Sequence, residues 1–292
     1  MTSPLRSAAK AVLRQWGVTT ASLRPLPDFL ILGTKRGGTT SLWNHLLEHP
    51  LVLPMFPAVQ NLKSPHYFYW HYERGERWYR SHFATRRRRS QASHGGGGTA
   101  LTGEASPYYL YHPYTPERVR ALLPAAKLII MLRDPVARAY SHYWERINEG
   151  VETLSFDDAI RVEDERLKGE VERMDVDPLY YSRPHDYFTY RDRGVYLPQL
   201  QRWFGHFPRE QALIIRSEDF YADRQRVFDE ICAFLGLPQH TLERPKRFNY
   251  RPAAPMSAET RSYLTEFFEP HNRALYDYLG RDFEWASPDE PR

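Results

Sequence analysis

The segment that most constrains this fold is an apolar run that breaks into a glycine-rich loop and then into a helical pattern. It spans residues 29–42, FLILGTKRGGTTSL. Continuous apolar residues without polar alternation are typical of a strand that is buried on both faces of a parallel sheet. A glycine-rich loop between such a strand and a helix presents backbone N–H groups and the positive end of the helix dipole to one anion. The segment therefore predicts a strand, an anion-binding loop and a helix.

The position of the lysine in this loop indicates which kind of anion it binds. In the nucleotide triphosphatase pattern G-x-x-x-x-G-K-[ST], the lysine follows the second glycine and reaches the β- and γ-phosphates. This chain keeps the glycine spacing from Gly33 to Gly38, but Thr39 stands where the lysine should be, and the lysine comes early, at Lys35. This arrangement argues against ATP or GTP hydrolysis and favours a 5′-phosphate that carries another group. A turn that binds no ligand is the alternative.

A second apolar run, in residues 127–143 (KLIIMLRDPVARAYSHY), ends in charged residues. Pro135 fits the first turn of a helix, and Asp134 before it is a good N-cap. Arg133 would then stand at the carboxyl end of a strand, where α/β sheets bind ligands, and Ser141 about two turns along the helix. This arrangement can hold a second phosphate. The alternative is a surface ion pair followed by an ordinary helical serine.

Together, the two segments resemble the PAPS-dependent sulfotransferases, which bind 3′-phosphoadenosine 5′-phosphosulfate (PAPS) and release 3′-phosphoadenosine 5′-phosphate (PAP). Residues 33–40 are similar to the family's 5′-phosphosulfate loop and residues 132–143 to its 3′-phosphate element. The likeness is closest to the heparan sulfate and related carbohydrate branch, and it extends from residue 27 to residue 285. It includes GEASPYY at 103–109, YTPERV at 114–119, FFEPHN at 267–272 and LGRDFEW at 279–285.

The resemblance implies which residues hold the donor. It assigns the 5′ side to Lys35, Arg36, Gly37, Gly38, Thr39, Thr40 and Ser41, and the 3′-phosphate to Arg133 and Ser141. By analogy with phosphoryl transfer, sulfuryl transfer is in line with a loose transition state, so Lys35 would neutralise the leaving phosphate without any metal. The family often closes a basic loop over the nucleotide where this chain has Lys246, Arg247 and Arg251. These three are weaker candidates, for which a solvated basic loop is the simpler explanation.

One position departs from the family pattern. Where the heparan sulfate branch has a glutamate as catalytic base, residues 63–68 (KSPHYF) place Ser64. A serine hydroxyl cannot act as a base near neutral pH. His66 is the first candidate for the proton acceptor because imidazole titrates near neutrality, and Glu104, expected to point from a sheet edge into the same crevice, is the second. A histidine in an aromatic cluster and a structural partner of an arginine are the respective alternatives.

Composition is compatible with one α/β enzyme of 292 residues. The net charge of +4 is too small to indicate a nucleic-acid binder by itself and suits anionic nucleotides. The single cysteine, Cys232, is expected in a buried helix and cannot form an intrachain disulfide. Because no apolar run approaches the length of a membrane span and the N-terminus lacks a signal-peptide core, we expect a cytoplasmic protein. Residues 5–16 predict a short helix that packs on the body, with peripheral membrane contact as the alternative.

The alternation of patterns predicts a P-loop-like three-layer sandwich in which helices flank a central, mostly parallel sheet. Strands are expected near 28–32, 51–53, 100–103, 127–132 and 211–216, and the most secure helices near 135–149, 223–236 and 257–279. A single domain would cover residues 25–286, between an N-terminal extension (1–24) and a C-terminal tail (287–292). Residues 150–200 are expected to form an insertion that faces the acceptor.

A low-complexity segment, in which four arginines (residues 86–89) are followed by four glycines (residues 95–98), predicts a mobile surface loop. The alternative is an electrostatic patch that captures an anionic acceptor.

The sequence therefore predicts a PAPS-dependent sulfotransferase that acts on a hydroxyl group of a glycan, a glycosylated molecule or a small molecule, with an amine as the alternative acceptor group. Two other functions stay open. A nucleotide or adenylylsulfate kinase would share the loop but needs Mg²⁺ and a lysine after Gly38. A non-catalytic nucleotide-binding protein would explain the missing glutamate.

Overall fold

A computed structural model describes residues 4–243 and 255–285, and its centre is a five-stranded sheet with the strand order β2-β3-β1-β4-β5. The strands are β1 (Phe29–Ile31), β2 (Val52–Leu53), β3 (Leu101–Ala105), β4 (Lys127–Leu132) and β5 (Ala212–Arg216). Every neighbouring pair is parallel, and the five predicted strands are confirmed.

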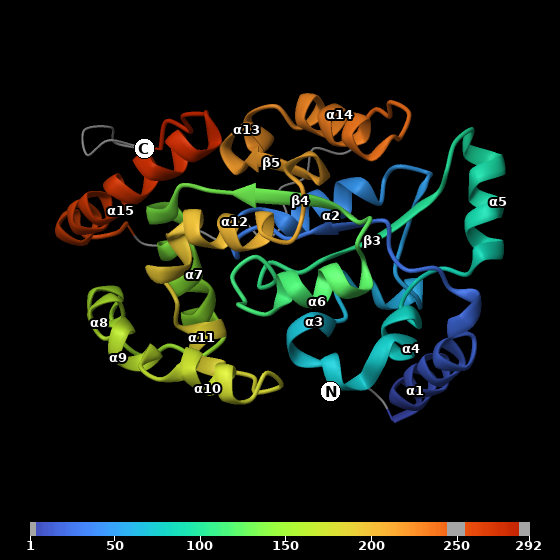
Figure 1. Ribbon diagram of the computed structural model, residues 1–292, viewed down its shortest axis with the longest axis horizontal. Helices are drawn as coiled ribbons and strands as arrows, with labels where there is room; N and C mark the ends of the chain where they lie inside the picture. The colour runs from blue at the N-terminus through green and yellow to red at the C-terminus, as the bar shows by residue number, and fades with distance from the viewer. Residues whose placement is uncertain (1–3, 244–254, 286–292) are drawn as a thin grey trace.

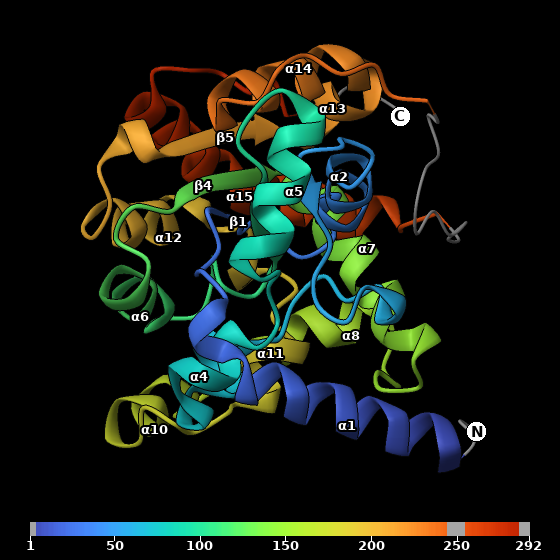
Figure 2. The same cartoon turned by 90° about the vertical axis from the view of Figure 1, so that its right-hand side faces the viewer.

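The sheet is buried because helices cover both of its faces. Figures 1 and 2 show α13 and α14 on one side and α6 on the other. The helices are α1 (Pro4–Thr19), α2 (Thr39–Leu46), α3 (Tyr67–Trp70), α4 (Gly75–Arg80), α5 (Arg86–Gly96), α6 (Thr115–Leu122), α7 (Pro135–Asn148), α8 (Phe156–Arg161), α9 (Glu163–Leu167), α10 (Glu170–Val176), α11 (Arg183–Tyr187), α12 (Tyr196–Phe204), α13 (Ser217–Ala222), α14 (Arg224–Leu235) and α15 (Ala258–Leu279). The three most secure helix predictions correspond to α7, α14 and α15 and are confirmed. Cys232 is buried in α14, as expected.

Packing in the centre of the sheet depends on one glycine. Gly103 of β3 pairs in register with Phe29 of β1. A Cβ atom at Gly103 would lie 2.5 Å from the Phe29 ring, closer than atoms can pack. A glycine at this position therefore lets the ring lie flat against the neighbouring strand.

The lobe formed by residues 150–200 is helical, and Figure 1 shows its helices α8 to α11 beyond α7, away from the strands. A second hydrophobic cluster joins α7 and α8 to α15, through residues such as Ala139, Phe156 and Phe268. This lobe thus packs against α7, the helix that follows β4. The packing fixes the lobe, and with it helix α11, beside α7.

The segment that starts with four arginines is not a loop, so that prediction is wrong. It forms α5, whose N-terminus is capped by Thr85, because the Arg88 N–H donates to the Thr85 hydroxyl. Arg89 anchors the helix to the sheet by donating to Asp28 at 2.8 Å and to the Ala100 carbonyl at 3.1 Å. Arginine is a good helix former, and a cap and an ion pair outweigh the glycines that follow.

The N-terminal helix α1 packs on the body, as the sequence predicts. Arg14 donates to the carbonyl oxygens of Ser81 at 3.1 Å and Phe56 at 3.0 Å. Across residues 4–243 and 255–285, none of the helices combines the length and the apolar character that crossing a membrane requires. Three predicted donor contacts, Lys246, Arg247 and Arg251, lie outside the described residues.

Candidate active site

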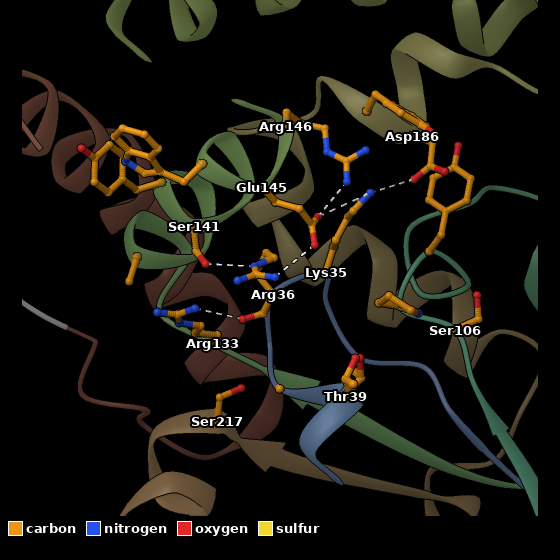
Figure 3. Close-up of a pocket in the computed structure, with 18 of the residues that line it drawn as sticks. Lys35, Arg36, Thr39, Ser106, Arg133, Ser141, Glu145, Arg146, Asp186 and Ser217 are labelled. Atoms are coloured by element: carbon orange, nitrogen blue, oxygen red, sulfur yellow. Dashed lines mark hydrogen bonds and ion pairs between the residues drawn. The ribbon is translucent and has the colours of Figure 1, made fainter. Parts of the chain in front are cut away.

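A cleft of about 1010 Å³ lies at the carboxyl ends of the strands, where parallel sheets bind ligands (Figure 3). Residues that follow four of the strands line this cleft. These are Lys35 after β1, Ser106 after β3, Arg133 after β4 and Ser217 after β5. Segments that are distant in sequence therefore meet in one site because their strands are parallel neighbours.

The β1–α2 loop has the backbone geometry of an anion-binding loop. Gly38 has φ of +92° and caps α2 in the left-handed conformation, which a glycine adopts without strain. The loop is fixed to its surroundings because the Thr34 N–H donates to the Met131 carbonyl at 2.8 Å and the Ser217 hydroxyl donates to the Gly37 carbonyl at 2.6 Å. The first N–H groups of α2 have no carbonyl partner within their own helix, as in any helix.

Lys35 lies in the cleft between two carboxylates (Figure 3). Its Nζ is 4.0 Å from Glu145 Oε2 and 3.6 Å from Asp186 Oδ1. Burial lowers the pKa of Lys35 to about 8, although the nearby carboxylate of Asp186 acts in the opposite direction. The lysine that stands early in the loop is therefore a buried cation whose charge is held in place by acidic side chains.

The residues predicted for the 3′-phosphate lie together on the other side of the loop. Arg133 donates to the Arg36 carbonyl at 3.0 Å, and Arg36 donates to the Ser141 hydroxyl at 3.0 Å and to Glu145 at 3.0 Å. Arg36 has φ of +71°, which turns its carbonyl toward Arg133. The structure thus brings Arg133, Ser141 and the 5′ loop into one cleft, as the sequence predicts, although their binding roles stay predictions.

Thr39, Thr40 and Ser41 also line the cleft, at the start of α2. The Thr40 hydroxyl accepts a hydrogen bond of 2.7 Å from Lys63. Burial lowers the pKa of Lys63, which is a second buried cation beside the loop. Sequence reasoning missed Lys63, even though it stands immediately before Ser64 in the segment that was compared with the family.

The two candidates for the catalytic base occupy different environments. His66 lines the cleft, its Nδ1 is 2.7 Å from the Tyr69 hydroxyl, and burial lowers its pKa to about 4. Glu104 is fully buried on β3 and is not part of the cleft lining. Its carboxyl group faces the core, contrary to the expectation that it points into the crevice. The catalytic assignments of both residues stay predictions.

Hydroxyl groups, rather than an arginine, hold Glu104. Ser64 donates to Oε2 at 2.8 Å, Tyr79 donates to Oε1 at 2.7 Å, and Tyr109 lies 3.2 Å from both oxygens. Burial raises the pKa of Glu104 to about 7, against the opposing effect of these hydrogen bonds. Ser64, which stands where the family has a glutamate, is therefore hydrogen-bonded to a carboxyl group in the core.

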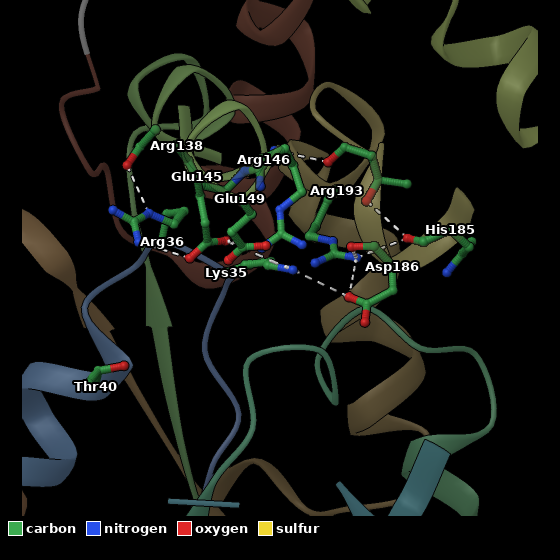
Figure 4. A network of polar contacts seen from close by, with 12 residues as sticks. Lys35, Arg36, Thr40, Arg138, Glu145, Arg146, Glu149, His185, Asp186 and Arg193 are labelled. Carbon is green, nitrogen blue, oxygen red and sulfur yellow. Dashed lines mark hydrogen bonds and ion pairs between the residues drawn. The ribbon is translucent and has the colours of Figure 1, made fainter. Parts of the chain in front are cut away.

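Asp186 is a residue of the cleft that the sequence did not single out. It lies on α11, where it faces Lys35 and Arg193 (Figure 4). The Tyr181 hydroxyl donates to Oδ2 at 2.8 Å, and Arg193 lies 3.5 Å from Oδ1. Burial by itself would raise the pKa of Asp186, but Lys35 and Arg193 outweigh it and hold the pKa below its ordinary value. Asp186 is therefore a buried carboxylate that stays ionised.

Comparison with known proteins decides the family. Residues 26–261 match the family model described as a sulfotransferase domain. The chain belongs to the sulfotransferase family. A crystal structure of a sulfotransferase from Alicyclobacillus acidocaldarius superposes on this sulfotransferase with a TM-score of 0.66 and 29% sequence identity, covering 89% of this chain and 98% of that one. The α/β fold with a central parallel sheet is thus that of a solved sulfotransferase.

Curated relatives of this sulfotransferase include enzymes of several kinds. It is 29% identical to the membrane-associated sulfotransferase kil1 of Dictyostelium discoideum, over 90% of this chain and 67% of that protein. It is 28% identical to the bifunctional heparan sulfate N-deacetylase/N-sulfotransferase 4 of Mus musculus, over 88% of this chain and 30% of that protein. It is 26% identical to the heparan sulfate glucosamine 3-O-sulfotransferase 3B1 of Mus musculus, over 91% of this chain and 66% of that protein. The chain thus spans about a third to two thirds of the length of these relatives.

Proposed function

We propose that this sulfotransferase transfers a sulfonate from PAPS to a hydroxyl group, with an amine as the alternative acceptor group, without a metal. The observation that carries the proposal is the pairing of two basic elements in one cleft. The loop with Lys35 and the element with Arg133 and Ser141 lie side by side, joined by the 3.0 Å contacts of Arg36. A donor with a phosphate on each side of its ribose requires two such elements.

The residues of the cleft fit the charge of the donor. The N–H groups at the start of α2 and the hydroxyls of Thr39, Thr40 and Ser41 would hold the 5′-phosphate, and Arg133 with Ser141 would hold the 3′-phosphate. Lys35 would lie near the oxygen that bridges phosphorus and sulfur, where negative charge develops as the bond breaks. Fixed cations of this kind need no reorganisation during the reaction.

For the acceptor, we propose a glycan, a glycosylated molecule or a small molecule. Two relatives are named for heparan sulfate, which supports a sugar hydroxyl or amine. The cleft also has aromatic walls, to which Tyr69, Trp70, Tyr140, Trp144 and Tyr181 contribute. Aromatic rings pack well against the apolar faces of sugar and other rings. The cytoplasmic location and the absence of a nucleic-acid partner stay predictions from the sequence.

A calorimetric titration tests the donor assignment. Purified protein is titrated with PAP, adenosine 5′-phosphate and ATP, each with and without Mg²⁺. We expect PAP to bind most tightly, independently of Mg²⁺, because it alone offers the 3′-phosphate to Arg133 and Ser141. A preference for ATP with Mg²⁺ would overturn the proposal and favour a kinase.

A turnover assay separates the enzyme from a non-catalytic nucleotide-binding protein. PAPS is incubated with the protein and a panel of sugar and phenol acceptors, and PAP release is measured. We expect acceptor-dependent release of PAP. Tight PAP binding without any transfer would favour the non-catalytic alternative, in which Ser64 marks a lost base.

A further inference from the structure

Because Ser64 stands in place of a glutamate, the proposed reaction has no assigned proton acceptor. The side chains that line the cleft indicate which residue takes this role. The inference rests on the proposed function. The histidine and the carboxyl groups of the lining are His66, Asp134, Glu145, Glu149, Asp186 and Glu218. Ser64 and Glu104 are not among them, because their side chains are hydrogen-bonded to each other and do not line the cleft.

His66 is poorly arranged to accept a proton. The Tyr69 hydroxyl keeps its proton, because burial raises its pKa well above the ordinary value, and it lies 2.7 Å from Nδ1 of His66. In the tautomer in which this hydroxyl donates to Nδ1, the neutral ring carries its proton on Nε2, and His66 would orient an acceptor oxygen rather than take its proton.

Four of the carboxyl groups are already committed to other partners. Glu145 lies 3.0 Å from both Arg36 and Arg146, and Glu149 lies 2.8 Å from Arg146. Asp134 caps α7 by accepting from the Val136 N–H at 2.9 Å. Glu218 accepts from the Asp134 N–H at 3.0 Å and from the Trp285 indole at 3.3 Å. These groups belong to α7 and α13, on the side of the cleft that holds the predicted 3′-phosphate site.

Asp186 also has partners, Tyr181 and Arg193, but it differs from the other carboxyl groups in its position. It comes from α11, on the opposite side of the loop, and it lies 3.6 Å from Lys35, the residue proposed to act on the bridging oxygen (Figure 4). Glu145 also approaches Lys35, at 4.0 Å, but it does so from α7. Under the role proposed for Lys35, Asp186 would lie beside the bond that breaks, on the side that α7 does not occupy.

The surroundings of Asp186 keep its side chain in one orientation. Arg193 is fully buried and donates to the carbonyl oxygens of His185 at 2.9 Å and Asp186 at 3.0 Å. Tyr181, which donates to Asp186, stacks on Trp70 with 5.1 Å between ring centroids, and 48% of Trp70 is exposed. Asp186 is thus both held by its neighbours and joined to the exposed aromatic wall where an acceptor ring can pack.

We propose that Asp186 is the catalytic base that accepts the proton of the acceptor. The acceptor O–H bond breaks, and its proton moves to a carboxylate oxygen of Asp186. The oxygen of the acceptor forms a bond to sulfur while the bond between sulfur and the bridging oxygen breaks. The electron pair of that bond stays on the 5′-phosphate of PAP, where Lys35 balances the charge. Asp186 then returns the proton to water. The carboxylate at position 186 thereby replaces a glutamate that the chain lacks at position 64.

Substituted phenols provide the test, because their hydroxyl groups differ in acidity while their shape stays similar. Asp186→Asn is compared with the wild-type chain and with Glu149→Gln, which also removes a carboxylate from the cleft lining. PAPS is the donor, and transfer is measured to alkyl phenols, which are protonated near neutral pH, and to nitrophenols, which are largely ionised. PAP affinity is measured in parallel by calorimetry.

We expect Asp186→Asn to lose about 10²–10⁴-fold in transfer to alkyl phenols, the usual contribution of a general base, and far less with nitrophenols, which need none. Glu149→Gln should retain transfer to both, and Asp186→Glu should recover part of the loss. PAP affinity should change little in Glu149→Gln and in Asp186→Glu, which keeps a carboxylate beside Lys35.

Two results would overturn the role of Asp186. One is an equal loss with both classes of phenol, which indicates a structural role, and the other is an unchanged Asp186→Asn variant. A wild-type chain that does not bind PAP, or that binds PAP but transfers to no acceptor, would instead refute the proposed function.

Discussion

Lys35 carries a charge that changes with pH in the range where enzymes are commonly assayed. Burial places its pKa at about 8, so the side chain is a cation below that pH and becomes neutral above it. We therefore expect the affinity for PAP to fall as the pH rises through about 8. In Lys35→Arg, whose guanidinium stays charged, this dependence should disappear. Calorimetry with PAP at pH 6.5, 7.5, 8.5 and 9.5 checks the prediction, and an unchanged slope in the arginine variant would contradict it.

Arg133 is predicted to recognise one particular phosphate. Its guanidinium donates to the Arg36 carbonyl at 3.0 Å and lines the cleft beside Ser141. If it binds the 3′-phosphate, Arg133→Ala should weaken the binding of PAP by about 1.5–3 kcal/mol, the usual value for a charged hydrogen bond. The binding of adenosine 5′-phosphate, which lacks that group, should change little. Parallel titrations of the variant with both nucleotides decide the matter, and equal losses would remove Arg133 from the 3′ site.

At the scale of residues, the local sequence pattern was sufficient to predict which side chains line the donor side of the cleft. Lys35, Arg133 and Ser141 each stand at a fixed distance from the end of an apolar strand, and the parallel sheet brings these strand ends together. Lys63 and Asp186 have no such local signal, because they reach the cleft through the packing of segments that do not directly follow its strands. Their positions in the cleft are visible only in the structure, through the contacts with Thr40 and Lys35.

At the scale of elements, the β1–α2 loop depends on the backbone of Gly38. In Gly38→Ala, the Cβ atom would lie 2.8 Å from the Tyr221 hydroxyl, at a φ of +92° that side chains rarely adopt. We expect the loop to shift and PAP affinity to fall at least tenfold, with the fold intact. Gly97→Ala is the matched control, since Gly97 also has a positive φ, +69°, but its Cβ would meet nothing within 4 Å.

Calorimetry with PAP and thermal unfolding of both variants check this prediction. Both should pay a similar backbone cost, about 1–2 kcal/mol, so both should unfold at somewhat lower temperatures. Equal PAP affinities in the two variants would show that the geometry of the loop is not what binds the anion.

Elements with strong periodicity were predictable, and elements that depend on caps and anchors were not. The five strands and helices α7, α14 and α15 follow directly from apolar patterning. Helix α5 has no apolar face, so its arginine- and glycine-rich composition predicts a loop rather than a helix. The decisive contacts are the cap from Thr85 and the ion pair of Arg89 with Asp28, a residue that precedes the first strand.

At the scale of the whole molecule, Glu104 couples stability to pH. Burial raises its pKa from 4.5 to about 7. Its contribution to stability is therefore complete below pH 4.5 and is lost as the pH rises through about 7, because the ionised form is unfavourable in the core. We expect the stability advantage of the wild type over Glu104→Gln to shrink by about 3 kcal/mol between pH 4.5 and 8. Urea unfolding at several pH values measures the difference.

The control for this experiment is Glu117→Gln, on the exposed side of α6. It reports how stability depends on pH when the substituted carboxyl group is not buried. A constant difference between wild type and Glu104→Gln across the pH range would contradict a raised pKa at Glu104.

The ion pair between Lys35 and Asp186 joins the two halves of a two-substrate reaction. Under the roles proposed for them, the nucleotide takes up the lysine and the acceptor takes up the carboxylate. Binding of the nucleotide to Lys35 releases Asp186 for the acceptor, and binding of the acceptor to Asp186 releases Lys35 for the nucleotide. The two substrates therefore bind cooperatively, and each raises the affinity for the other by the same factor. Product PAP, which occupies Lys35 as the donor does, would then retain acceptors in unproductive ternary complexes.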